Sequence, residues 1–169
     1  MSGGAAPAVS LRPSTPEDRP FLARVYASTR EEELANVPFS PEEKAAFVEQ
    51  QFSAQTAHYA RHYHDTSFDL ILVDGEPAGR LIVGRWHDQV RIVDVALLPE
   101  FRGLGVGTRV LEPVLAEGEA RGVPVTIHVE QFNPAQRLYR RLGFEQVSSE
   151  GIYLRFERLA GGAQANTAS

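Results

Sequence analysis

The spacing of apolar residues changes at residue 68, and this change constrains the fold more than any other feature of the chain. Before it, apolar side chains recur three and four residues apart within 21–29 and 45–59, which predicts two helices. After it, 69–73, 78–86 and 90–98 have strand character and are separated by turn residues. Two helices followed by a three-strand meander predict a mixed α/β domain.

The remaining segments complete this prediction. Thr15-Pro-Glu-Asp18 and Ser40-Pro-Glu-Glu43 are typical of helix starts, since a hydroxyl cap precedes a proline and an acid. We expect further strands and helices at 9–12, 105–121, 124–130, 134–142, 144–147 and 152–156. The sequence therefore predicts a mixed, mainly antiparallel sheet of about seven strands flanked by four helices.

Composition limits the organisation and the partners. The chain of 169 residues suits one domain, expected at 9–158, with tails at 1–8 and 160–169 that lack bulky apolar groups. It has no cysteine, which excludes disulfides, thiolate catalysis and cysteine-bound zinc. The net charge of −5 gives no reason to expect nucleic acid. Without an apolar run of about 20 residues or a signal-like N-terminus, we expect a cytoplasmic protein with no membrane partner.

A glycine-rich segment joins the third meander strand to the next helix. It has the pattern R-x-x-G-x-G, with Arg102, Gly105 and Gly107 at the fixed positions. The first N–H groups of a helix have no intrahelical partner, and the helix dipole adds positive potential there. Glycines let this backbone approach a ligand closely, while Arg102 adds a charge and Thr108 a hydroxyl. The segment predicts an anion site.

Other interpretations of this segment differ in how well they fit. A Walker loop requires a lysine that is absent here. A dinucleotide fingerprint requires a third glycine, and the two possible registers place Thr108 or Val110 there. A glycine-rich connection without any ligand remains an alternative.

A second motif follows one helix and one strand later. Asn133-Pro-Ala135 leads into a helix that ends in L-Y-x-x-L-G-F, residues 138–144. Together the two motifs resemble those of the GNAT superfamily of acyl-CoA-dependent N-acetyltransferases. The resemblance extends over roughly 9–158 and is strongest over 90–145.

The resemblance implies that acetyl-CoA is the co-substrate and that no metal is required. Its pantetheine arm would lie where strands 90–98 and 124–130 separate, paired with backbone groups of Val95, Ala96 and Leu97. The amide of Leu97 would also polarise the thioester carbonyl. The resemblance assigns the diphosphate and other cofactor contacts to Arg102, Gly103, Leu104, Gly105, Val106, Gly107, Thr108 and Asn133.

The implied reaction is direct attack by a primary amine in a ternary complex. Tyr139 is the candidate acid for the departing thiolate, because a phenol donates without ionising at neutral pH. Its alternative role is packing. Asp94, His128 and Glu130 are candidate bases. Asp94 interrupts an apolar run, where an acid is costly unless it pairs with Arg91 or with a neighbouring strand. A solvated outer face is the alternative for the other two.

Several questions stay open at this level. A non-catalytic acyl-CoA-binding module and an interaction protein with a structural glycine turn are alternatives to an enzyme. The acceptor amine, a small molecule or a peptide, is not specified. The resemblance makes a homodimer possible. His58 and His62 have zinc-compatible spacing, but a hydrated helix face explains them better.

Overall fold

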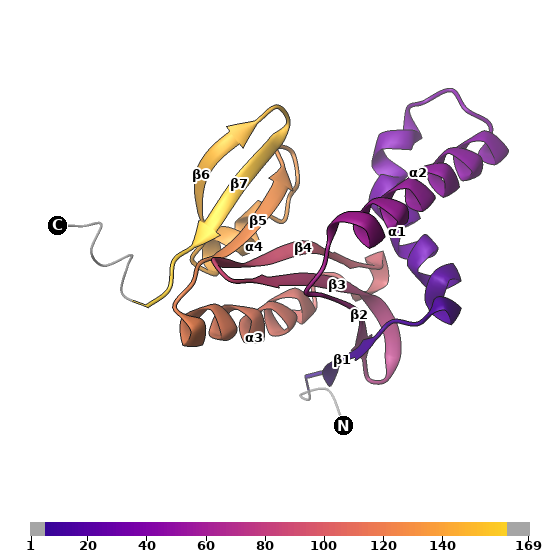
Figure 1. Cartoon of the computed structure of the whole chain (residues 1–169). Helices are drawn as coiled ribbons and strands as arrows, with labels where there is room; N and C mark the ends of the chain where they lie inside the picture. Colours follow the sequence, from indigo (N-terminus) through magenta and orange to yellow (C-terminus); the bar gives the residue numbers. More distant parts are fainter. Residues whose placement is uncertain (1–5, 162–169) are drawn as a thin grey trace.

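The computed structural model describes residues 6–161 and contains one seven-stranded sheet with helices on both faces (Figure 1). The strand order is β1-β2-β3-β4-β5-β7-β6, in which only β4 and β5 are parallel. The strands are β1 (Val9–Pro13), β2 (Thr66–Val73), β3 (Glu76–Trp86), β4 (Gln89–Leu97), β5 (Val125–Glu130), β6 (Glu145–Glu150) and β7 (Tyr153–Arg158). The helices are α1 (Arg19–Ala35), α2 (Pro41–His62), α3 (Val106–Arg121) and α4 (Gln136–Arg141). The predicted fold class is confirmed.

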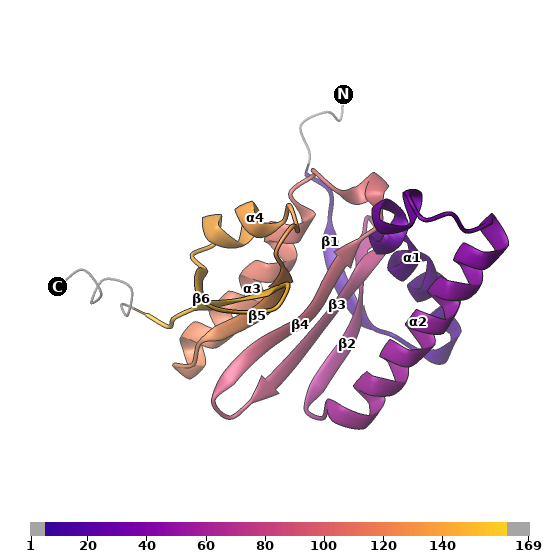
Figure 2. The same cartoon turned by 90° about the horizontal axis from the view of Figure 1, so that it is seen from above.

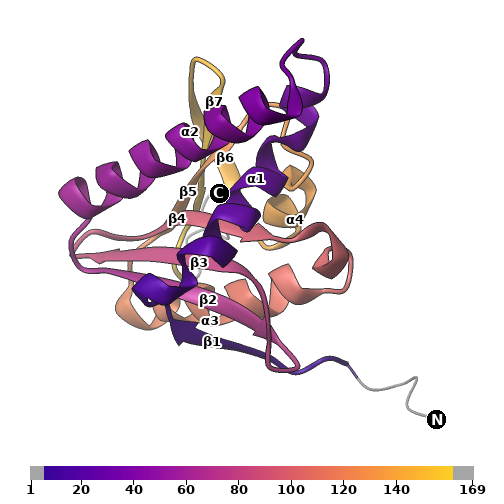
Figure 3. The ribbon, with the colours of Figure 1, turned by 90° about the vertical axis from the view of Figure 1, so that its right-hand side faces the viewer.

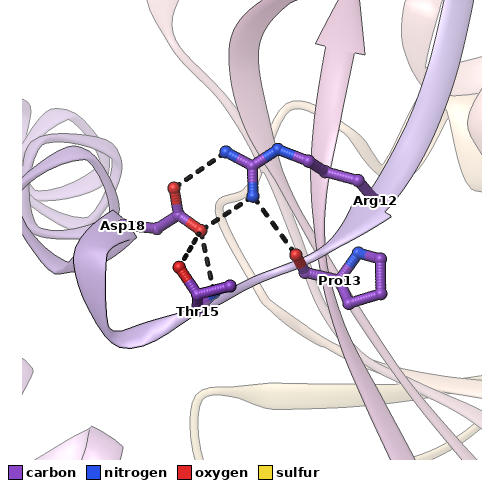
Figure 4. Close-up of polar contacts among 4 residues, drawn as sticks. All are labelled: Arg12, Pro13, Thr15 and Asp18. Carbon is purple, nitrogen blue, oxygen red and sulfur yellow. Dashed lines mark hydrogen bonds and ion pairs between the residues drawn. The ribbon is translucent and has the colours of Figure 1, made fainter.

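The second predicted helix start forms a full capping box, whereas at the first the Thr15 hydroxyl caps no N–H group and only the Asp18 side chain makes the expected bond. At α2, the Glu43 N–H donates to the Ser40 hydroxyl, and the Ser40 N–H donates to the Glu43 carboxylate. Near α1, Asp18 accepts from the Thr15 N–H at 2.8 Å and closes a short 3-10 turn, Pro16–Asp18, ahead of the helix. Asp18 also accepts two hydrogen bonds from Arg12 of β1 (Figure 4), and these hold the pKa of its carboxyl well below the usual range.

The helices divide into two pairs on opposite faces of the sheet (Figure 2). Under α3 and α4 lies the larger apolar core, which includes Leu111, Ile127 and Phe156. On the other face, Tyr26 of α1 and Phe52 of α2 are buried, with ring centroids 5.6 Å apart. The alternation of side chains along each strand assigns one set of residues to each core.

The two parallel strands separate soon after they pair. Their register joins only 90–92 to 125–127, although β4 continues to Leu97 and β5 to Glu130. An extra residue, Val93, shifts the register of β4 against β3 at this point. Figures 1 and 3 show β4 continuing beside β3 while β5, β6 and β7 turn away together. The separation opens the sheet between β4 and β5.

Three differences from the predicted boundaries bear on the site and on the tails. The helix predicted at 134–142 is the six-residue α4, because Pro134 and Ala135 form a turn before it. Gly105 is the N-cap of α3 and lies outside the helix. Ala8, expected in a tail, exchanges hydrogen bonds with Asp74. Residues 1–5 and 162–169 of the expected tails lie outside the described residues.

Candidate active site

Peptide groups of β4 face the opening between the parallel strands. The Leu98 N–H donates to the Ala78 carbonyl, and hydrogen-bonding direction alternates along an antiparallel pair. The peptide groups of Ala96 therefore point toward β3, whereas those of Val95 and Leu97 point toward β5. Of the three residues expected to pair with the pantetheine arm, only Val95 and Leu97 therefore direct their peptide groups into the opening, and Ala96 does not. The Leu97 carbonyl accepts from the Arg102 guanidinium at 3.0 Å.

The glycine-rich turn follows directly on this strand. Gly103 and Gly105 have φ of 77° and 78°, the left-handed region in which glycine avoids the strain of a side chain. The space beside each is open, since an added Cβ would meet nothing within 4 Å. Gly107 has a different role, because an added Cβ would lie 3.2 Å from Leu138 of α4. Two glycines form the turn, and the third lets α4 pack against α3.

The N–H groups of residues 103–108 have no acceptor within residues 6–161. The first backbone bond that holds α3 to the turn runs from the Arg109 N–H to the Gly105 carbonyl at 3.2 Å. Six free donors at the start of a helix, with open space before them, fit a phosphate or diphosphate group. Arg102 adds its charge nearby, and Thr108 its hydroxyl.

Tyr139 of α4 is 4% exposed and packs against Phe144 and Phe156, at ring centroid distances of 6.0 and 6.5 Å. Burial raises the pKa of its phenol well above the ordinary value, and the negative charge of Asp94 raises it further. The phenol therefore stays protonated and can act as a donor. Tyr139 belongs to the α3/α4 side and Asp94 to the other face, and the charge of Asp94 still reaches the Tyr139 phenol across the sheet.

Asp94 is paired, as an acid in an apolar strand requires. Its partner is Arg80 of β3, 2.5 Å from Asp94 Oδ2, and not Arg91. Arg80 also donates to Gln55 of α2 at 2.6 Å, which holds the guanidinium from two sides. Asp94 Oδ1 makes no hydrogen bond to residues 6–161. Burial and then the charge of Asp94 raise the pKa of Tyr59. Asp94 therefore raises the pKa of two tyrosines, Tyr59 of α2 and Tyr139 of α4.

His128 presents a donor to the solvent. Arg91 Nη1 lies 3.2 Å from His128 Nδ1, and because a guanidinium only donates, Nδ1 is the acceptor. The proton of the neutral ring is then on Nε2. Burial, Arg91 and Arg155 lower the pKa of His128, which keeps the ring neutral near pH 7. This arrangement disfavours His128 as a base.

Glu130, the third candidate base, lies 3.8 Å from Arg30 of α1. Arg30 is bound more closely to Glu33, at 2.6 Å, and packs over the Tyr26 ring. Glu130 thus forms an ion pair that links β5 to α1 across the opening.

Asn133 lies on an exposed loop, and its side-chain oxygen accepts from the Ala135 N–H at 2.8 Å. This bond orders the turn before α4, the helix that carries Tyr139. Gln55, Tyr59 and Arg80 were not predicted from the sequence. Arg80 carried a signal, because it is a charged residue inside a buried strand, but its partners lie on α2 and β4.

Metal and membrane features are limited. The rings of His58 and His62 are 4.6 Å apart on α2. Within residues 6–161, no group of three metal-ligating side chains converges. Among the described helices, none combines the length and the apolar character that a bilayer crossing demands.

Comparison with known families identifies the arrangement. The model of the acetyltransferase (GNAT) family matches residues 24–144, which include β4, the glycine turn and Tyr139. The chain belongs to this family. The predicted resemblance is therefore confirmed, and the described geometry is that of a GNAT acetyltransferase domain. No curated protein matches the sequence significantly.

Solved structures of the same fold cover nearly the whole chain. One is the PaiA N-acetyltransferase of Thermoplasma acidophilum in complex with coenzyme A, with a TM-score of 0.70, 16% identity, and coverage of 90% of this chain and 99% of that one. A second is an acetyltransferase of Thermus thermophilus, with a TM-score of 0.64, 22% identity, and coverage of 90% of this chain and 97% of that one. A third is Ard1 of Thermoplasma volcanium, with a TM-score of 0.61, 18% identity, and coverage of 91% of this chain and 99% of that one. At these identities the likeness establishes the fold.

Proposed function

We propose that this GNAT protein transfers an acetyl or another short acyl group from acetyl-CoA to a primary amine by direct attack in a ternary complex. The observation that supports this best is the opening between β4 and β5. There the peptide groups of Val95 and Leu97 have no partner strand, and Tyr139 lies buried on one side. Family membership supports an acyltransferase in general.

The residues that would hold the co-substrate follow from its chemistry. Val95 and Leu97 would pair with the pantetheine amides as an added strand does. The N–H groups of residues 103–108 would bind the diphosphate, with Arg102 beside them. Acetyl-CoA supplies the activated acyl group. PaiA of Thermoplasma acidophilum, which has this fold, was crystallised with coenzyme A.

The transfer forms a nitrogen–carbon bond and breaks a carbon–sulfur bond, while one proton leaves the amine and one reaches sulfur. In this proposal the Leu97 N–H donates to the thioester carbonyl oxygen as negative charge develops there. Tyr139 donates a hydrogen bond to the sulfur and stabilises the departing thiolate, because its raised pKa keeps the phenol protonated. The released thiolate takes its proton from solvent.

Among the three candidate bases we favour Asp94. Its Oδ2 is fixed by Arg80, and its Oδ1 is free to orient the ammonium group and to receive a proton, directly or through water. His128 presents a donor, and Glu130 is paired with Arg30. The acceptor would then approach from the face that carries α1 and α2.

Two measurements test the proposal. Isothermal titration with acetyl-CoA should show saturable binding. Thiol release should follow when the complex meets an amine from a panel of amino acids, polyamines, aminoglycosides and peptides. Binding without turnover of any amine would instead favour an acyl-CoA-binding module. An absence of binding at millimolar acetyl-CoA would refute the proposal.

A further inference from the structure

Arg91 of β4 is half-buried, and all of its hydrogen-bond partners are neutral. Its Nε donates to Thr126 at 2.6 Å, Nη2 donates to Gln89 at 3.1 Å, and Nη1 donates to His128 at 3.2 Å. The guanidinium also lies over the Trp86 ring, 5.8 Å from its centroid. No carboxylate of residues 6–161 lies within 4.0 Å of Arg91. A half-buried charge without a counter-ion is costly.

In the cluster around Arg91, the acceptor atoms already receive hydrogen bonds, whereas several N–H groups have no acceptor. The hydroxyl of Thr126, a fully buried side chain, accepts from Arg91 and donates to Gln89 at 2.6 Å. The Gln89 side-chain oxygen therefore accepts twice. A guanidinium has five N–H groups, so two remain on Arg91, and His128 adds its Nε2–H. A group that only accepts hydrogen bonds complements such a cluster.

Neighbouring charges leave Arg91 uncompensated. Arg155 lies opposite His128 in the β5–β7 pair, but Glu157 binds it at 3.1 Å. Burial and Arg155 lower the pKa of Arg91, and Tyr63, Glu157 and Asp88 offset this only in part. The charge of Arg91 is thus not balanced by its surroundings.

The cluster lies on the same face of the sheet as Asp94. Arg91 pairs with Gly84 and Asp94 with Ile82, two residues apart on β3, so both side chains point away from α3. Because their partners are two residues apart on β3, their backbones are separated by about 7 Å along the strand. The Arg91 guanidinium reaches back toward Gln89, whereas the Asp94 carboxylate is bound by Arg80 nearer the end of β4. A molecule that meets both must therefore hold its ammonium group and its anion several bonds apart.

We propose that Arg91 and His128 bind a carboxylate or phosphonate group of the acceptor, so that the preferred substrates carry an anion several bonds away from the amine, as short peptides do. This assignment rests on the proposed acyl transfer for the role of the ligand. The binding site itself rests on the side-chain cluster.

Trp86 is the only tryptophan of the chain and lies against Arg91, so its fluorescence reports on the site without any turnover. Acetate and methylphosphonate are titrated at an ionic strength held constant with NaCl. We expect a saturable change in the wild type, and affinity about 10-fold weaker in Arg91→Gln. Arg85→Gln removes an exposed arginine of β3 that pairs with Glu117, and should leave the curve unchanged. Linear responses, or equal curves for wild type and Arg91→Gln, would overturn the site.

A second comparison tests the link to the acceptor. Dipeptides are compared with their C-terminal carboxamides, such as glycylleucine with glycylleucinamide, by kcat/KM. Because the carboxamide also makes the amine less basic, the informative quantity is how the preference changes in Arg91→Gln. We expect the variant to lose about 10-fold of the carboxylate preference while it retains turnover of the amide. Arg91→Lys serves if Arg91→Gln does not fold, as circular dichroism would show.

The outcomes separate the two proposals. Saturable anion binding without a carboxylate preference that depends on Arg91 would overturn the assignment to the acceptor. Acetyl-CoA binding with no turnover of any amine would count against acyl transfer, and fluorescence would still decide the anion site.

Discussion

The two sides of the opening between β4 and β5 present different kinds of functional group. On the α3/α4 side the functional groups are mostly backbone, namely the peptide groups of Val95 and Leu97 and the N–H groups of 103–108. On the α1/α2 side they are charged side chains, Arg80, Asp94 and Arg91, held by partners from other elements. Backbone sites depend on local conformation and follow from a short motif, whereas side-chain sites depend on how distant strands are placed.

Tyr139 is the exception on the α3/α4 side, because its role depends on a side chain, and removal of its hydroxyl should give the largest effect. Tyr139→Phe keeps the ring that packs on Phe144 and Phe156 but loses the donor. We expect kcat to fall about 100-fold, the range for loss of one donor to a developing negative charge, with little change in CoA affinity. Thiol-release assays measure kcat, and isothermal titration measures the CoA affinity. Tyr153→Phe, on an exposed tyrosine of β7, is the control. Equal activity in Tyr139→Phe would remove the donor role.

Asp94 tests how far the α1/α2 side depends on paired charges. Asp94→Asn leaves the Arg80 guanidinium, whose side chain is 8% exposed, without its counter-ion. We expect the free energy of unfolding to fall by about 2 kcal/mol, together with a loss of turnover. Glu49→Gln breaks the exposed pair with Arg19 and should change stability little. Urea unfolding compares them, and equal midpoints would contradict the structural role of the buried pair.

Gly105 tests the backbone side. In Gly105→Ala a side chain must adopt φ near 78°, which costs about 1 kcal/mol and disturbs the donors of the turn. We expect CoA affinity to fall about 10-fold. Gly151→Ala is a matched control, because its φ is 62° in the β6–β7 turn, away from the donors. It should lose similar stability and keep its affinity for CoA. If both variants bind CoA alike, the turn is only structural.

Substitution of His128 should give the smallest of these effects, a change in how the free energy of unfolding depends on pH. The pKa of His128 is lowered in the folded state, so below about pH 6.5 the unfolded chain binds the proton first. Its neutral form therefore contributes stability that is lost as the pH falls through about 6.5 and below. His128→Gln should show a shallower loss in urea unfolding over this range. His87→Gln, in the exposed β3–β4 turn, should match the wild type. Identical slopes for wild type and His128→Gln would contradict the lowered pKa.

The sequence predicted the features that repeat locally. Ser40 and Glu43 form the capping box that their spacing indicates, and the glycine-rich segment joins a strand to a helix as predicted. The partner of Asp94 was predicted less well, because Arg91 and a neighbouring strand were equal alternatives. Register decided between them, since Arg80 of β3 reaches Asp94 across one strand pair.

The sequence by itself determined the family, the order of elements and the backbone donors, because caps, glycines and hydrophobic periods act within a few residues. Only the tertiary structure decided which charges meet. It separated β4 from β5 after three paired residues, turned the peptide groups of Val95 and Leu97 into the opening, and fixed the His128 proton through Arg91. Hydrogen-bonding direction and strand register depend on neighbours distant in the chain, so no local pattern encodes them.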